Sequence, residues 1–287
     1  MTHRRAVWIL VGCAFIWGAS FTLNKTLLTS VSPMVYVAAR FSLGCLLLSP
    51  LYRHTTRADW RAGLPLGLLF GLQLSLFAAG LSTTPPARAA FLFSVQTPLV
   101  PVLVLGLHRQ FPHSREIVAV LVALAGSWLL TRPATGTIGL TRGDFLLLVN
   151  AVVAAIYVVA ASHVGPRHDP MRLLAVQFVA MASVGLVLAL TIETPRFEPN
   201  LTTALLLPFL AVSSIASFGG QLLGQKLIRP TEAALIFALE PVVAAITSFV
   251  SFGERLSPGQ WLGGGLILTA ALLVSVRTRI GNSGASL

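Results

Sequence analysis

Apolar runs long enough to cross a lipid bilayer recur along the whole chain. A transmembrane helix needs ~20 predominantly apolar residues. Of the 287 residues, 55% are hydrophobic and only 10% are charged, and the mean hydropathy is +0.82, which excludes a soluble globular protein of ordinary composition. The runs are apolar on every side, and a helix satisfies its own backbone polar groups within lipid, so the sequence predicts an all-α integral membrane protein.

These runs divide the chain into ten predicted transmembrane helices. The loops between them are too short to hold a soluble domain. The first run exceeds 20 residues and lacks a clear cleavage motif, so we expect it to stay in the protein instead of being removed as a signal peptide. The predicted spans are 7–28, 34–51, 63–81, 87–107, 116–131, 144–163, 171–191, 203–225, 232–252 and 258–276.

Positive charge differs between the two sets of alternate loops and predicts the orientation. Thirteen of the 20 Lys and Arg residues fall in the tails and in one set of loops, six fall in the other set, and Arg40 lies within a span. Cytoplasmic loops carry the excess of Lys and Arg, so both termini are predicted to be cytoplasmic. The net charge of +11 therefore calls for no nucleic-acid partner, because the basic residues are scattered one to three per loop.

The second half of the sequence repeats the first. Three sets of residues recur in the same order, 137 to 144 residues apart: Ala14, Ile16 and Trp17 with Ala154, Ile156 and Tyr157; Pro33, Ala38, Arg40 and Phe41 with Pro170, Ala175, Gln177 and Phe178; Pro86, Ala89, Phe93 and Gln96 with Pro230, Ala233, Phe237 and Glu240. Each half holds five predicted spans, an odd number, so the second copy enters the membrane from the opposite face. The predicted architecture is ten transmembrane helices arranged as two inverted five-helix repeats, 1–135 and 136–287. Such repeats are typical of carriers that work by alternating access, and the alternative is a duplication that only builds a stable bundle.

Two ionisable residues inside predicted spans are the main functional candidates, because a charge within the bilayer is costly. Glu240 lies eight residues into its span, or ~12 Å at 1.5 Å per residue, near the bilayer midplane. We predict that Arg40 attracts a substrate carboxylate and that Glu240 binds an amine or carries a coupled proton. The structural alternative is that Arg40 reaches the headgroups or caps carbonyls, while Glu240 bonds backbone groups freed by Pro241.

Aromatic and amide side chains complete a predicted substrate cavity. Apolar cavities with a few polar groups suit amphiphilic solutes, although any one of these residues could serve packing instead. The further substrate-binding candidates are Trp17, Asn24, Gln73, Gln96, Tyr157, Gln177 and Gln221. Proline removes an amide donor and can bend a helix, so hinge or gating positions are predicted at Pro98, Pro101, Pro208 and Pro241.

The sequence offers no catalytic or cofactor-binding constellation. No buried nucleophile has a histidine base, and no cluster of His, Cys and carboxylate side chains has metal-ligand spacing. We therefore predict that the protein is not an enzyme and binds no cofactor or metal, and that its partners are membrane lipids and a small-molecule substrate. A membrane-embedded enzyme and a passive channel are the less favoured alternatives.

Motifs in both halves of the chain are similar to those of a known family. They are Leu239–Ala245, Phe252–Ser257 and Gln260–Leu268 in the second half, and Ile16–Phe21, Ala38–Phe41 and Thr97-Pro98 in the first. These segments resemble the EamA family of the drug/metabolite transporter superfamily. The resemblance implies a secondary transporter of the bacterial inner membrane that exports amino acids, including aromatic ones as in the YddG type. Other metabolites or cationic drugs are the alternative substrates. The first half departs from the pattern by reading Gln110-Phe111-Pro112 where the second has Gly253-Glu254-Arg255.

Overall fold

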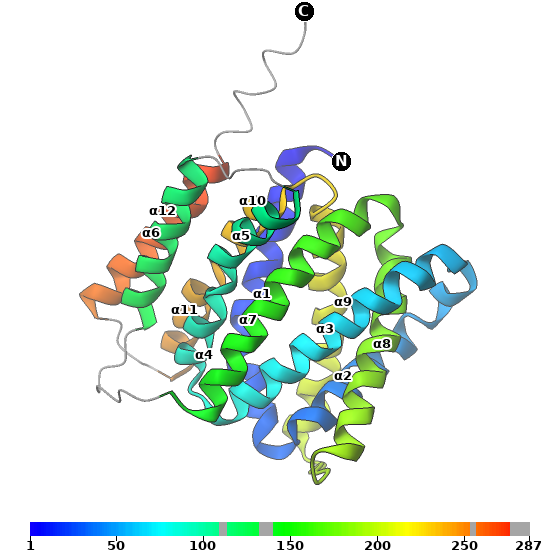
Figure 1. Ribbon diagram of the computed structural model, residues 1–287. Helices are drawn as coiled ribbons and strands as arrows, with labels where there is room; N and C mark the ends of the chain where they lie inside the picture. Colours follow the sequence, from blue (N-terminus) through cyan, green and yellow to red (C-terminus); the bar gives the residue numbers. More distant parts are fainter. Residues whose placement is uncertain (109–113, 132–139, 253–256, 276–287) are drawn as a thin grey trace, which may run out of the picture.

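The computed structural model describes residues 1–108, 114–131, 140–252 and 257–275, and this part of the chain is almost entirely α-helical (Figure 1). Its helices are α1 (His3–Ser30), α2 (Pro33–Leu47), α3 (Arg57–Thr83), α4 (Pro86–Ser94), α5 (Gln96–His108), α6 (Ser114–Thr131), α7 (Arg142–Val164), α8 (Pro170–Thr191), α9 (Leu201–Gly224), α10 (Pro230–Phe237), α11 (Glu240–Phe252) and α12 (Pro258–Ser275), with short 3-10 turns η1 (Ser49–His54) and η2 (Gly165–Arg167). The prediction of an all-α integral membrane protein is confirmed. The motif residues Gln110-Phe111-Pro112 and Gly253-Glu254-Arg255 lie outside the described residues.

Seven segments in the described part of the chain are long and apolar enough to cross a membrane. Each coincides with one of the ten predicted spans, and α2 is a shorter apolar helix at the position of another. The two remaining predicted spans fall on α6 and α12. The full count of ten stays a prediction.

Two predicted span boundaries are wrong, for identifiable local reasons. Span 34–51 ends at Leu47 and gives way to η1, because Pro50 disfavours helical backbone at the residue before it. Span 63–81 begins earlier, at Arg57, where Thr56 and Asp59 form a capping box that supplies partners for the free N–H groups at the helix start.

Predicted spans four and nine are each broken into two helices. α4 ends at Ser94, four residues before Pro98, and α10 ends at Phe237, four residues before Pro241. A proline lacks the N–H that would bond the carbonyl four residues earlier, and its ring clashes with that carbonyl. Each break therefore lies at the carbonyl that the following proline leaves without its helical N–H donor. Pro101 and Pro208 lie inside the continuous helices α5 and α9, so no break accompanies them.

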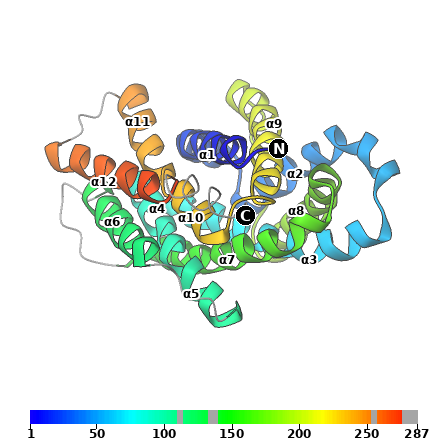
Figure 2. The ribbon, with the colours of Figure 1, turned by 90° about the horizontal axis from the view of Figure 1, so that it is seen from above.

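The helices form two opposed rows with the same neighbour relations in each half. Figure 2 shows α11, α1 and α9 along one side, α5, α7 and α3 along the other, and α4 and α10 between them. α1 packs against α9 and α11, just as α7 packs against α3 and α5, while α2 packs against α8 and α6 against α12. α1 and α7 run in opposite directions (Figure 1), because α7 begins where α1 ends.

Contacts at the two ends of the bundle establish these directions. Lys25, near the end of α1, donates to the carbonyls of Leu81 and Ser82 at 2.8 Å each. A Cβ on Gly143, at the start of α7, would lie 2.3 Å from the hydroxyl of Thr83, which closes the same helix, α3. At the opposite end, where α1 begins, His3 contacts the start of α10. We call these the α7 end and the α1 end.

Gly18 allows α1 to approach α11 closely. A Cβ at Gly18 would lie 2.6 Å from Val243 Cβ and 2.7 Å from the Glu240 carbonyl oxygen, whereas a Cβ at Gly12 meets nothing within 4 Å. We expect Gly18→Ala to lower the free energy of unfolding by about 1–3 kcal/mol, because overpacking forces the backbone apart. Gly12→Ala, on the same helix, is the matched control and should leave stability unchanged or slightly higher. Thermal unfolding of the purified variants measures both, and equal stabilities would contradict the packing argument.

Candidate functional site

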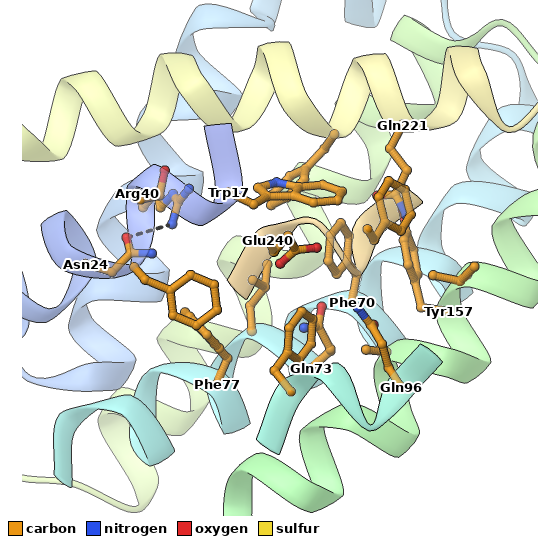
Figure 3. A pocket seen from close by; sticks show the side chains of 18 residues that line it. Trp17, Asn24, Arg40, Phe70, Gln73, Phe77, Gln96, Tyr157, Gln221 and Glu240 are labelled. Atoms are coloured by element: carbon orange, nitrogen blue, oxygen red, sulfur yellow. Dashed lines mark hydrogen bonds between the residues drawn. The ribbon is translucent and has the colours of Figure 1, made fainter. Parts of the chain in front are cut away.

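A cavity lies between the two rows of helices. It contains about 620 Å³ of atom-free space, its open side included, and is lined by 18 residues from both halves of the chain. Eight of the nine predicted substrate-binding residues line it: Trp17, Asn24, Arg40, Gln73, Gln96, Tyr157, Gln221 and Glu240 (Figure 3). The ninth, Gln177, lies behind the wall and accepts a hydrogen bond from the Tyr157 hydroxyl at 2.9 Å.

Aromatic rings form most of the apolar wall. Phe70 stacks on Tyr157 with ring centroids 4.0 Å apart, and it also contacts Phe218 at 4.6 Å. Trp17 meets the edge of Phe237 at 5.0 Å. Sequence reasoning identified Trp17 and Tyr157 but missed Phe70 and Phe218 as lining residues, because an isolated phenylalanine in an apolar helix carries no signal that distinguishes a cavity wall from a lipid-facing surface. Phe237 carried one weak signal, its place in the repeat.

Arg40, on α2, is only 4% exposed and ties three helices together. Its Nε donates to the carbonyl of Leu210 at 3.2 Å and to the hydroxyl of Ser214 at 2.7 Å, both on α9. Its Nη1 donates to Asn24 Oδ1 on α1 at 3.4 Å and to the Tyr36 hydroxyl. The expected carbonyl cap is therefore present, but Arg40 does not reach out to the headgroups. No described acid forms an ion pair with it.

Glu240 is the first residue of α11, at the break in span nine, and is 3% exposed. Its carboxylate faces the middle of the cavity, between Trp17 and Phe70 (Figure 3). Oε1 is buried without a hydrogen-bond partner, and no described basic residue forms an ion pair with Glu240. Gln96, the residue that matches it in the first half, is likewise the first residue of its helix, α5. The helix breaks thus bring both residues to the cavity.

The amide side chains differ in how far their hydrogen-bonding capacity is used. Gln73 Nε2 donates to Asn150 Oδ1 at 3.0 Å. Gln221, on α9, is 2% exposed and its Oε1 has no partner in the described structure. Buried polar groups are normally satisfied, and this oxygen retains the capacity to accept a hydrogen bond.

An ion pair at one end of the bundle and a histidine–carboxylate contact at the other connect the two halves. At the α7 end, Arg88 at the start of α4 bonds Asp144 at the start of α7, with Nη2 to Oδ2 at 2.7 Å. At the α1 end, Glu232 at the start of α10 lies 3.3 Å from His3. Arg88 and Glu232 are 144 residues apart, the offset of the repeat in this region. The two interactions therefore occupy corresponding positions in the two halves, but the basic and the acidic residue are exchanged between them.

Seven apolar segments of spanning length in the described part of the chain define a multi-pass membrane protein. Residues 4–132 and 141–276 match the model of the EamA-like transporter family. The chain belongs to this family, and the resemblance drawn from the motifs is confirmed.

Several relatives extend over nearly the whole chain. An uncharacterized transporter of Archaeoglobus fulgidus is 30% identical over 267 residues, covering 92% of this chain and 83% of the relative. The threonine/homoserine exporter RhtA of Escherichia coli K12 is 26% identical and covers 94% and 92%, and the uncharacterized inner membrane transporter YedA of the same strain is 26% identical and covers 91% and 87%. A solved crystal structure superposes over 97% of this chain and 99% of its own with a TM-score of 0.76 at 19% identity, which establishes a shared fold.

Proposed function

We propose that this protein is a secondary transporter that exports amino acids, aromatic ones included, or related small metabolites across the bacterial inner membrane by alternating access. The observation that carries the proposal is the cavity between the two rows of helices, which holds a buried acid and a buried base that are not paired with each other. Unpaired charges buried in a membrane protein are costly and mark solute pathways.

The proposed architecture is two inverted five-helix repeats with both termini in the cytoplasm. The opposite directions of α1 and α7, and the matching neighbour relations in the two halves, support the inversion. The excess of Lys and Arg at the tails and in one set of loops supports the orientation. In inverted repeats the halves can exchange conformations, which opens the central site to one side and then to the other.

The helix breaks are the proposed hinges of this motion. Pro98 and Pro241 lie in the first turns of α5 and α11, directly after the two breaks. Because backbone bonds are missing there, rotation of the half-helices requires little disruption. Pro101 and Pro208, inside α5 and α9, complete the proposed set of gating positions as bends within continuous helices.

Amino acids fit the charges of the proposed site. Among the described residues, hydrogen bonds engage Nε and Nη1 of Arg40 but not Nη2, which leaves the two N–H donors of Nη2 for a substrate carboxylate. Glu240 is the corresponding candidate for an amine or for a coupled proton. RhtA, named as a threonine/homoserine exporter, supports this substrate class, and the aromatic wall supports the aromatic members of it.

Counterflow in liposomes tests the proposed function. We expect liposomes preloaded with the correct unlabelled amino acid to accumulate the labelled one transiently, because a carrier exchanges solute while a pore does not. Each of the twenty amino acids and a set of cationic drugs should be screened in this way. Uptake without acceleration by solute on the opposite side would indicate a channel, and chemical conversion of the solute would indicate an enzyme; either result contradicts the proposal.

Export of cationic drugs is the second candidate function. The observation that favours it is the same unpaired Glu240 carboxylate among aromatic rings, since such rings attract cations as well as apolar groups. The two candidates differ in the number of N–H donors that the cation offers to the carboxylate.

A further inference from the structure

We infer that the cavity binds the protonated primary amine of its substrate at Glu240 and Gln221, an assignment that rests on the proposed transport function and specifies its substrate class. Both residues line the cavity, and each has a buried Oε1 without a hydrogen-bond partner. Leaving a buried acceptor unpaired is destabilising, and more so when the acceptor is charged. Both orphaned atoms are acceptors, so the missing partner is a donor.

Trp17 packs against residues that lie three positions before each acceptor in the sequence. Its ring lies 5.8 Å from Phe218, three residues before Gln221 on α9, and 5.0 Å from Phe237, three residues before Glu240. The indole is held in place because its Nε1 donates to the hydroxyl of Ser217 at 3.0 Å. A cation beside Glu240 is therefore surrounded by fixed aromatic rings, which attract it further.

This arrangement selects for the number of N–H donors. A primary ammonium group carries three N–H donors and a positive charge, as the lysine ammonium does, so it can satisfy Glu240 and Gln221 together. A quaternary ammonium group has the charge but no N–H, and it leaves both acceptors unpaired. A solute with only a carboxylate leaves the Glu240 charge uncompensated and adds a second negative charge to the cavity.

The charge of the subsite belongs to the second half alone. Glu240 corresponds to Gln96 in the first half, and both residues line the cavity. The pseudo-symmetric position therefore lacks the negative charge. A substrate consequently binds in one orientation, with its amine toward α9 and α11.

Four related probes test the inference on the full-length purified protein by calorimetric titration. They are L-phenylalanine, 2-phenylethylamine, 3-phenylpropionate and the quaternary trimethyl derivative of 2-phenylethylamine. We expect the two primary amines to bind at least tenfold more tightly than 3-phenylpropionate and the quaternary compound. Equal binding of the quaternary compound, or no binding of either primary amine, would overturn the assignment, and this comparison needs no variant.

Variants then locate the subsite. Glu240→Gln and Gln221→Leu should each weaken binding of L-phenylalanine at least tenfold. Gln225→Leu is the matched control, an amide four residues further along whose buried Oε1 also has no partner in the described structure but which does not line the cavity, and it should weaken binding less than threefold. Unchanged affinity in both subsite variants would overturn the inference. The two proposals fail in different ways. Counterflow of an amine-free solute would support the carrier and contradict only the amine subsite. Absence of counterflow for every solute would contradict the carrier itself.

Discussion

Replacing Glu240 by glutamine is expected to abolish the dependence of transport on a pH gradient. Among the described residues that line the cavity, Glu240 is the only acid, and one carboxylate cannot hold a proton and a substrate ammonium group at the same time. Mutually exclusive binding at one site couples the two flows, because the carrier returns with a proton after it releases the amine. An amide of nearly the same size cannot take up the proton, so transport should follow the substrate gradient alone.

The measurement is the initial rate of solute flux in liposomes, with and without an imposed pH gradient, at a substrate concentration raised to offset the weaker binding. Glu198→Gln is the control, since Glu198 is an exposed acid that pairs with Arg196 away from the cavity. We expect the control to keep the pH-gradient response of the original protein. A full response in Glu240→Gln would eliminate Glu240 as the proton site.

Replacing Asp144 by asparagine is expected to cause a large loss of stability. The Asp144 side chain is 1% exposed and accepts hydrogen bonds from Arg88 at 2.7 Å and from the Thr141 amide at 2.7 Å. The change removes the charge that faces Arg88 and weakens the capping box that begins α7. Breaking a buried ion pair costs about 3 kcal/mol or more, which lowers the Tm by roughly 6–12 °C.

Arg196→Gln provides the matched comparison for Asp144→Asn. Arg196 and Glu198 also form an ion pair, at 3.2 Å, but both side chains are about half exposed. Exposed pairs contribute about 0–1 kcal/mol, so the Tm of this variant should change by roughly 4 °C at most. Thermal unfolding in the same detergent measures both variants. Similar Tm shifts in the two variants would show that the Arg88–Asp144 ion pair between α4 and α7 does not stabilise the fold.

Much of the architecture follows from the sequence because lipid imposes strong constraints on it. Hydrophobic length located the spans, and seven of the ten coincide with segments of spanning length in the described structure. The repeat identified Glu240 and Gln96 as corresponding residues, and Pro98 and Pro241 indicated the two broken spans, whereas Pro208 lies in a continuous helix. These are local properties of the chain, and they depend on composition and backbone chemistry more than on the packing of neighbours.

The partners of each site residue could not be predicted in the same way. Nothing in the sequence connects Arg40 to Leu210 and Ser214, which lie 170 and 174 residues away, or shows that Gln177 lies behind Tyr157 when the other candidates reach the cavity. A helical wheel cannot distinguish the cavity-facing side from a packed or lipid-facing side when all sides are apolar. The amino-acid sequence was sufficient to place Arg40 and Glu240 within predicted spans. The folded chain was needed to show that both line one cavity, because that depends on how helices distant in sequence pack together.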